Sequence, residues 1–244
     1  MIDLSERVIV VTGAGGGIGT GIARRLAEAG ASLLLVTRES RPPVLDGKHE
    51  ALRVDLTSAN APDAVVAAAV EAFGRIDGLV NNAGIQPLSS LTDVSDVDFR
   101  TMIETDLVAV HRLTQATAKE MTQRRNGGSI VHIASIEGIQ PAPLHGHYAA
   151  AKAGLRMHAR AAAQEWGAHG IRVNTVSPGL IDRPGLENDW PEGVQRWLKA
   201  APLQRLGRPE DVGDACVFLC SDLASFISGA DLVVDGGVLT NPTW

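Results

Sequence analysis

A tyrosine and a lysine four residues apart are the side chains in this sequence with the most evident chemistry. Tyr148 is the only tyrosine of the chain, and Lys152 follows it near the start of a segment, 147–169, with helical periodicity. Residues i and i+4 share one face of a helix, with Cβ atoms about 5–6 Å apart. An ammonium group at that distance favours the phenolate and lowers the phenol pKa from its free value of about 10. The pair therefore predicts a general acid–base group.

The position of Ser135 adds to this prediction. Ser135 lies just past the apolar run Ile130–Ile133, which is typical of a buried strand. Ligands bind at the carboxyl ends of strands in open α/β sheets. Ser135 is therefore expected at a ligand-binding edge of the sheet.

A glycine-rich loop, Thr12–Gly19, predicts a binding site for a dinucleotide. It reads TGAGGGIG, follows the apolar run Val8–Val11 and leads into the helical segment Ile18–Ala29. Glycines let backbone N–H groups approach a pyrophosphate, and the N-terminus of the following helix adds partial positive charge. The expected contacts come from Gly13, Gly16, Gly17, Ile18 and Gly19.

The end of the second predicted strand, Leu33–Val36, indicates which dinucleotide binds. An acidic residue there would bind ribose hydroxyls and disfavour a 2′-phosphate, but the chain has Thr37-Arg38 and no carboxylate before Glu39. Arg38 can stack on adenine and pair with a phosphate. The sequence therefore favours NADP(H) over NAD(H); the alternative is a solvated Arg38 with NAD(H) bound.

Unbroken apolar runs alternate with amphipathic segments along almost the whole chain. Continuous hydrophobicity suits strands buried on both faces, and strict alternation implies right-handed βαβ crossovers. We predict an α/β fold, a doubly wound Rossmann sheet of about seven parallel strands flanked by helices on both faces, in one domain spanning 1–244. The runs are Val8–Val11, Leu33–Val36, Leu79–Val80, Ile130–Ile133, Ile171–Val176 and Leu232–Val234, and the segments are Ile18–Ala29, Ala61–Phe73, Asp96–Arg124, His147–His169 and Pro209–Ser221.

Two segments interrupt this alternation. Glu39–Glu50 contains Pro42-Pro43 and Gly47, so a full helix is not expected there. Leu180–Pro202 is rich in proline and reads as a long irregular insertion, typical of a lid over a binding site. The alternative is a surface excursion whose tryptophans pack for stability.

Composition and charge exclude several classes of protein. The chain of 244 residues has 45% hydrophobic and 20% charged residues, which is ordinary for a globular domain. A net charge of −6, without a basic run, does not favour nucleic acid as a partner. No apolar run is long enough to span a membrane, and the N-terminus lacks the pattern of a signal peptide, so we expect a cytoplasmic protein with no membrane partner.

Cysteines and histidines do not form a metal-binding pattern. Cys216 and Cys220 lie four residues apart in an apolar stretch and are expected to be buried small hydrophobes. No HExxH or Cys–His grouping occurs, so we expect no metal. For His145 and His147, which precede Tyr148, contact with substrate and a role in loop structure both stay open.

Five motifs, taken in chain order, resemble the short-chain dehydrogenase/reductase family. The similarity covers essentially the whole chain, from Val8 to the closing sequence Val234-Asp235-Gly236-Gly237. The motifs are Gly13-x-x-x-Gly17-x-Gly19, Asn81-Asn82-Ala83-Gly84, Ser135, Tyr148-x-x-x-Lys152 and Pro178-Gly179.

The resemblance implies catalytic roles for three side chains. Tyr148 would pass a proton to or from a substrate oxygen, Ser135 would hydrogen-bond that oxygen, and Lys152 would bind the nicotinamide ribose and depress the Tyr148 pKa. The reaction would interconvert an alcohol and a carbonyl compound, with the hydride carried by the cofactor and no metal.

The resemblance also implies cofactor contacts. Asn82-Ala83-Gly84 would support the central strands and flank the adenine ribose. Asp55, followed by Leu56, matches the family's adenine contact. Ile181, just after Pro178-Gly179, would meet the carboxamide through its backbone.

Two positions depart from the family pattern. Asp106 stands where the family has an asparagine that helps to hold a water of the proton relay, and its charge could pair with Lys152. Asp106 is therefore grouped with the candidate catalytic residues. Arg183 stands where many relatives have a threonine that bonds the carboxamide, and it could instead meet substrate, a cofactor phosphate or solvent.

The predicted pocket walls are mostly apolar. No cluster of lysine or arginine is placed to bind a phosphorylated or carrier-bound substrate, so we expect a moderately hydrophobic ketone or secondary alcohol. A 3-oxoacyl thioester reductase is the alternative. A non-catalytic NADP(H)-sensing protein is an alternative of another class, disfavoured because all the catalytic side chains are present. The walls come from Ile136–His147 and, in the lid, from Leu180, Leu186, Trp190 and Trp197.

The long helical segments Asp96–Arg124 and His147–His169 carry alanine-rich apolar faces. In the family that the sequence resembles, such faces pair subunits. We therefore expect a homo-oligomer, either a dimer or a tetramer.

Overall fold

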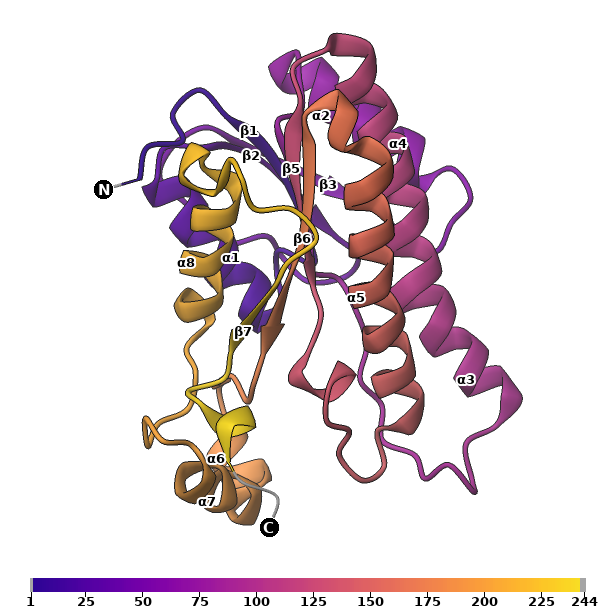
Figure 1. Cartoon of the computed structure of the whole chain (residues 1–244), viewed down its shortest axis with the longest axis vertical. Helices are drawn as coiled ribbons and strands as arrows, with labels where there is room; N and C mark the ends of the chain where they lie inside the picture. The colour runs from indigo at the N-terminus through magenta and orange to yellow at the C-terminus, as the bar shows by residue number, and fades with distance from the viewer. Residues whose placement is uncertain (1, 242–244) are drawn as a thin grey trace.

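Seven parallel strands form one sheet with the order β3-β2-β1-β4-β5-β6-β7 (Figure 1). The computed structural model describes residues 2–241. The strand order reverses between β1 and β4, which is the doubly wound arrangement that the sequence predicts. The strands are β1 (Val8–Thr12), β2 (Ser32–Thr37), β3 (His49–Arg53), β4 (Gly78–Asn81), β5 (Gly128–Ile133), β6 (Ile171–Pro178) and β7 (Asp231–Val234).

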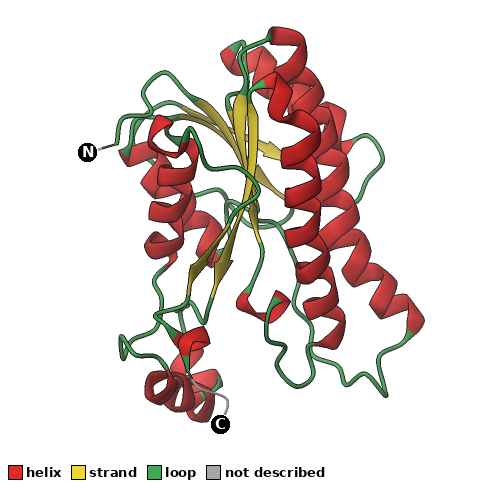
Figure 2. Cartoon of the chain, viewed as in Figure 1, coloured by secondary structure: helices red, strands yellow, loops and turns green. Residues whose placement is uncertain are grey.

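Helices cover both faces of the sheet (Figure 2). α1 and α8 lie on one face, and α2, α4 and α5 lie on the other, each group over its own cluster of buried apolar side chains. No helix within residues 2–241 is long and apolar enough to cross a membrane. The helices are α1 (Gly17–Glu28), α2 (Ala61–Phe73), α3 (Asp96–Ile103), α4 (Ala109–Arg124), α5 (Gly146–Trp166), α6 (Leu186–Asp189), α7 (Pro191–Ala200) and α8 (Pro209–Cys220).

The crossing of α1 and α8 depends on small residues. A Cβ atom on Gly213 would lie 2.8 Å from the carbonyl oxygen of Gly21, so the two helices approach to backbone contact. Cys216 and Cys220 are buried free thiols in the same cluster. The interpretation of both cysteines as buried small hydrophobes is therefore confirmed.

The strand β3 is the element that apolar runs did not reveal. It has the sequence HEALR and pairs only with β2, at the edge of the sheet, so most of its side chains reach solvent. A strand with little buried surface needs no continuous hydrophobic run. The segment Glu39–Glu50 forms no helix, as its prolines predict. Its last two residues, His49 and Glu50, are the first two residues of β3.

The long segment Asp96–Arg124 is helical throughout, but it is not one regular helix as predicted. Residues Glu104–Val108 form a π-helical turn between α3 and α4. Ser95 caps the start of α3, where its Oγ accepts a hydrogen bond from the backbone N–H of Asp98 at 3.1 Å. A π turn widens the helix locally and often marks a functional site.

The segment 180–202 is not the irregular insertion predicted, because it folds into the short helices α6 and α7. Both helices lie beyond the carboxyl ends of β6 and β7 (Figure 1). Leu186 and Val194 are buried, and Pro191 occupies the first position of α7, where a missing N–H costs nothing. The Trp197 ring packs on Gly179, where an added Cβ would lie 2.5 Å from the ring.

Candidate active site

Ser135 and Tyr148 meet at the carboxyl end of β5. Ser135 extends past β5 and caps a 3-10 turn, Ile136–Gly138, with its Oγ accepting a hydrogen bond from the backbone N–H of Glu137 at 3.1 Å. The turn packs closely on α5, because a Cβ on Gly138 would lie 2.9 Å from the carbonyl carbon of Lys152. Tyr148 lies in the first turn of α5, where the Ser135 hydroxyl is near enough to lower the pKa of its phenol. The two predicted catalytic hydroxyls are thus brought together.

Lys152 lies one turn further along α5, below the tyrosine. Its side chain is buried, and its Nζ donates a hydrogen bond to the carbonyl oxygen of Ile133 at 3.1 Å. The same Nζ lies 5.4 Å from the centroid of the Tyr148 ring. The spacing of four residues therefore places the ammonium beside the phenol, as predicted.

The pKa of Tyr148 is raised from its ordinary value, not lowered as expected. Burial of the phenol is the main cause, because it penalises the charged phenolate. Lys152 and the nearby Ser135 hydroxyl both lower the pKa, so the predicted influence of Lys152 has the right sign. The charges of Asp106 and Glu137 add to the increase. The sequence showed the lysine but not the degree of burial.

Asp106 lies in the π-helical turn and is fully buried. Its Oδ1 accepts a hydrogen bond from the backbone N–H of Ile85 at 2.9 Å, and its Oδ2 lies 3.1 Å from Lys152 Nζ. The second contact is an ion pair without hydrogen-bond alignment. A Cβ on Gly84 would lie 2.7 Å from Oδ2, so the glycine leaves room for the carboxylate.

The glycine-rich loop joins β1 to α1 in a form that fits a phosphate group. Gly13 has φ of +62°, and a Cβ there would lie 2.9 Å from the Cα of Ala83. A Cβ on Gly19 would overlap the carbonyl oxygen of Gly13, whereas a Cβ on Gly17 would meet nothing within 4 Å. Gly16 caps α1 without a side-chain hydrogen bond, so the first N–H groups of the helix stay available for an anion.

The sequence after β4 fastens this loop to the sheet. Asn82 Nδ2 donates hydrogen bonds to the carbonyl oxygens of Thr12 and Gly13 at 3.0 and 3.1 Å. The backbone N–H groups of Asn82 and Ala83 donate to Thr12 Oγ1 at 2.9 and 3.0 Å. These bonds give Asn82 and Ala83 the supporting position that the family resemblance implies.

Ile181 keeps its own backbone groups free. It forms an isolated bridge with Gly207, through hydrogen bonds from Asp182 N to Gly207 O and from Gly207 N to Leu180 O, at 2.8 and 3.0 Å. The N–H and C=O of Ile181 have no partner within residues 2–241. Arg183, two residues on, is exposed and pairs with Asp189 at 2.7 Å.

The segment after β2 carries two arginines, Arg38 and Arg41. Arg38 follows β2, is exposed, and has its Nε 3.3 Å from Glu39 Oε1. A Cβ on Gly15 would overlap Ser40 and the backbone of Arg41, so this segment closes over the glycine-rich loop. The sequence predicts a role for Arg38 but not for Ser40 or Arg41, because the prolines of 39–50 indicate only an irregular connection there.

Asp55 lies after β3 with its carboxylate held by Thr57. Its Oδ1 accepts hydrogen bonds from the Thr57 backbone N–H and hydroxyl at 2.9 and 2.8 Å, and these bonds lower the pKa of Asp55. Leu56 turns inward and packs against the apolar cluster under α2. Pro178 is the last residue of β6, and Gly179 N donates to Val234 O at 2.9 Å.

The pocket wall 136–147 is more polar than predicted. Glu137 Oε2 lies 2.6 Å from His145 Nδ1, and Gln86 Nε2 donates to Glu137 Oε1 at 3.3 Å. His147 is buried, and neither of its ring nitrogens has a hydrogen-bond partner among the described residues. Glu137 and His145 thus form an ionisable pair within a segment that the sequence predicts to be mostly apolar.

Behind the site, three histidines form a chain from β5 to the surface. Asn81 Nδ2 donates to His132 Nδ1 at 3.1 Å, which leaves the proton of His132 on Nε2, 3.3 Å from His158 Nδ1. His158 Nε2 lies 3.1 Å from His111 Nδ1. Burial, with the nearby His158 and Lys152, lowers the pKa of His132 to about 3. No group of three side chains suited to a metal ion occurs within residues 2–241.

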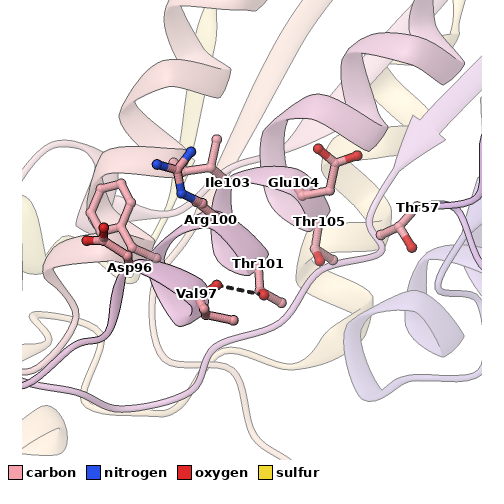
Figure 3. Close-up of a pocket in the computed structure, with 9 residues that line it drawn as sticks. Thr57, Asp96, Val97, Arg100, Thr101, Ile103, Glu104 and Thr105 are labelled. Atoms are coloured by element: carbon pink, nitrogen blue, oxygen red, sulfur yellow. Dashed lines mark hydrogen bonds between the residues drawn. The ribbon is translucent and has the colours of Figure 1, made fainter.

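A broad surface hollow of about 890 Å³ is lined by residues of α3 and the π-helical turn together with Thr57 (Figure 3). Thr101 Oγ1 in its wall donates to Val97 O at 2.8 Å. Glu104 and Thr105 line the hollow just before Asp106 in the chain, but none of the predicted catalytic residues does. The chemistry of the site therefore lies outside this hollow.

The chain is similar over almost its whole length to known dehydrogenases. It shares 36% identity with L-rhamnose 1-dehydrogenase (NAD(P)(+)) of Azotobacter vinelandii, over 98% of each chain. It shares 41% identity with cis-4-hydroxycyclohexanecarboxylate dehydrogenase of Sinomonas cyclohexanicum, over 96% of each chain. The solved structure of a short-chain type dehydrogenase/reductase from Mycobacterium marinum superposes with a TM-score of 0.92, at 32% identity and over 98% of each chain.

A family model described as enoyl-(acyl carrier protein) reductase matches residues 13–239. The model covers the glycine-rich loop, the tyrosine and lysine, and the sequence after β7. With the sheet order and the relatives above, the match establishes the family that the five motifs resemble. This chain is an oxidoreductase that belongs to the short-chain dehydrogenase/reductase family.

Proposed function

We propose that the chain is an NAD(P)(H)-dependent alcohol dehydrogenase or ketoreductase that interconverts a secondary alcohol and a ketone on a moderately hydrophobic small molecule. The observation that carries this proposal is the arrangement of Tyr148, whose phenol lies near the Ser135 hydroxyl and beside the Lys152 ammonium. A hydroxyl pair at the carboxyl end of a strand, next to a buried cation, can hold an oxygen and exchange a proton with it.

Membership of the family implies a nicotinamide cofactor, and residues of this chain fit one. The open space at Gly17 and the free N–H groups of α1 suit a pyrophosphate. The unpartnered N–H and C=O of Ile181 match the acceptor and donor of a carboxamide. Lys152 would bind ribose hydroxyls. When bound, the cofactor supplies or accepts the hydride.

In the direction of alcohol oxidation, Tyr148 acts as the base. Its phenolate takes the proton of the substrate hydroxyl, while Ser135 donates a hydrogen bond to the same oxygen and holds it in place. Lys152 stabilises the phenolate, and Asp106 compensates the lysine charge in the protein interior. In ketone reduction, the Tyr148 hydroxyl returns the proton to the oxygen.

We infer a preference for NADP(H) from the end of β2. Arg38 and Arg41 carry guanidinium groups on either side of Ser40 in sequence, and Ser40 and the backbone of Arg41 lie against Gly15 of the glycine-rich loop. Guanidinium groups bind phosphate in fork geometry. No carboxylate at the strand end itself is placed to bind a ribose 2′-hydroxyl instead.

The proposed substrate is small and largely apolar, and its pocket would be closed by the segment 180–202 as a lid. Apolar side chains are exposed on the loops around Tyr148, as they are on the lid at Trp190. The Sinomonas relative is named for an alcohol on a cyclohexane ring. A 3-oxoacyl thioester is the second candidate, favoured by the acyl carrier protein in the family model's description.

We further propose that the protein is a cytoplasmic homo-oligomer, a dimer or a tetramer. Met157 on α5 and Val97 at the start of α3 are 60% and 71% exposed, so these helices present apolar side chains that a second subunit could cover. Both cysteines within the described residues are unpaired thiols, as expected in a reducing compartment. Sedimentation of the purified chain would give the number of subunits.

The experiment for the catalytic assignment is Tyr148→Phe. Loss of the phenol oxygen removes the acid–base group, so turnover of a panel of ketones and of 3-oxoacyl thioesters should fall by about 10²–10⁴-fold. Binding of NADPH, followed by its fluorescence, should change little, because the ring stays in place. Retained turnover in the variant would refute the role of Tyr148, and binding without any turnover in the wild type would indicate a cofactor sensor.

A further inference from the structure

The substrate side of Tyr148 carries an ionisable pair that the proposed chemistry does not use. Glu137 and His145 are in contact, with 2.6 Å between Oε2 and Nδ1, and their side chains are only 15% and 17% exposed. The other carboxylate oxygen, Oε1, accepts a hydrogen bond from Gln86 Nε2 at 3.3 Å. Both oxygens of Glu137 are therefore engaged, so the carboxylate is fixed in orientation.

This pair borders the groups that would hold the reacting oxygen. The backbone N–H of Glu137 donates to Ser135 Oγ at 3.1 Å. The His145 ring lies edge-on to the Tyr148 ring, with 6.1 Å between their centroids. The charge of Glu137 also raises the pKa of Tyr148, which places the carboxylate within electrostatic reach of the phenol.

Two loops hold His145 in position. Ser89 N donates to Leu144 O at 2.9 Å, which joins the loop after β4 to the loop before α5. Leu144 has φ of +68°, a left-handed conformation that is rare for a branched residue and persists only where its surroundings impose it. Leu91 packs against Gly146, so the start of α5 is enclosed on this side.

The contact with Glu137 determines which hydrogen bond His145 can make. A carboxylate oxygen accepts only, so the ring carries its proton on Nδ1 and, when neutral, presents a lone pair on Nε2. That Nε2 has no hydrogen-bond partner among the described residues. With a neutral ring, the pair therefore offers an acceptor for an O–H group.

We propose that Glu137 and His145 form a subsite for a second hydroxyl group of the substrate, on the carbon next to the reacting carbinol. Oxygens on adjacent carbons lie within one hydrogen-bond length of each other, so an alcohol bound at Tyr148 would present its neighbour to His145. The preferred substrates are then vicinal diols and the matching α-hydroxy ketones. This inference rests on the proposed alcohol–ketone chemistry.

The test compares an alcohol that lacks this second hydroxyl with two diols that have it. Cyclohexanol and the cis and trans isomers of 1,2-cyclohexanediol are oxidised with NADP+ by the wild type and by Glu137→Gln and His145→Phe. We expect the wild type to show at least a 10-fold higher kcat/KM for one diol isomer than for cyclohexanol. In both variants, the ratio of kcat/KM for this diol to kcat/KM for cyclohexanol should be close to one. A change in Tyr148 that alters both rates equally cancels in this ratio.

Glu165→Gln is the matched control, since Glu165 is an exposed carboxylate near the far end of α5. Glu165→Gln should oxidise the three alcohols at the wild-type rates and with the wild-type ratio of diol to cyclohexanol kcat/KM. A ratio near one in the wild type, or a diol preference that survives both substitutions, would overturn the subsite. If the wild type oxidises none of the three alcohols and reduces neither cyclohexanone nor 2-hydroxycyclohexanone, the proposed alcohol–ketone chemistry is overturned instead.

Discussion

The two halves of the candidate site are built from different material. The half suited to a dinucleotide phosphate is backbone, held by Gly13, Gly19 and the amide of Asn82, with no ionisable group in the loop itself. The catalytic half consists of ionisable side chains, and Lys152 and Asp106 are both buried. Substitutions should therefore act through sterics in the first half and through charge in the second.

This difference decides how each half responds to its surroundings. A backbone cradle is set by φ angles and close approach, which do not change with pH. A buried ionisable group has a pKa set by burial and by every charge nearby, as the raised pKa of Tyr148 shows. The four predictions below test this contrast.

The largest effect is expected from a methyl group in the cradle. Gly19→Ala places a Cβ on the carbonyl oxygen of Gly13, and overpacking against backbone costs about 1–3 kcal/mol of unfolding free energy. Gly17→Ala is the matched control, because its Cβ meets nothing within 4 Å. Urea unfolding without cofactor should show a loss in the first variant alone. Equal stability of the two variants would remove the steric account of the loop.

The next effect comes from a buried histidine in the ionisable half. The pKa of His132 is about 3 in the folded chain, against about 6.5 when unfolded. Between these values the unfolded state binds a proton that the folded state does not, so stability falls as pH drops below about 6.5. At pH 5 the loss is about 2 kcal/mol.

Urea unfolding at pH 7.5 and pH 5.0 measures this loss. In His132→Asn the difference in unfolding free energy between pH 7.5 and pH 5.0 should shrink by about 2 kcal/mol. The cost of the substitution itself is the same at both pH values, so it cancels in this difference. His169→Gln changes an exposed histidine and should leave the difference as it is. An unchanged difference in His132→Asn would show that His132 does not govern acid stability.

A smaller effect is expected at the cofactor's adenine end, where the backbone half borders charged side chains. Arg38 is exposed, and an exposed ion pair contributes up to about 1 kcal/mol, so Arg38→Ala should weaken NADP+ binding by up to about 5-fold. NAD+, which lacks the phosphate, should bind with nearly the same Kd as before. Arg24→Ala, on the exposed side of α1, is the control. Equal losses for both cofactors would contradict the role of Arg38 in phosphate recognition.

The same contrast explains what the sequence could predict. Six of the seven strands appear as apolar runs. Five of them are buried along most of their length, whereas β7, at one edge, is partly exposed despite its run, and β3, at the other edge, has no such run. The cradle follows from glycine itself, since only that residue fits at Gly13 and Gly19. Residue type and spacing were enough for these features.

Contacts between distant loops could not be predicted from residue type and spacing. Nothing in the spacing of Glu137, His145 and Gln86 shows that they meet, because two loops must first fold against each other. The sign of the Tyr148 pKa shift was also missed, since burial outweighs the lysine that the sequence does show. The helix α7 was missed although Val194, Trp197 and Leu198 follow helical spacing, because the prolines of 180–202 were interpreted as breaking any helix.

The smallest expected effect separates charge from shape within the ionisable half. Asp106→Asn keeps an oxygen that can accept from the Ile85 N–H but removes a charge that raises the pKa of Tyr148. The Tyr148 pKa should therefore fall, so the acidic limb of the pH–rate profile for alcohol oxidation moves to lower pH. Asp98→Asn, at the exposed start of α3, should leave the profile in place. A shift in the alkaline direction would mean that Asp106 acts mainly by fixing Lys152, because loss of the lysine's proximity would raise the Tyr148 pKa instead.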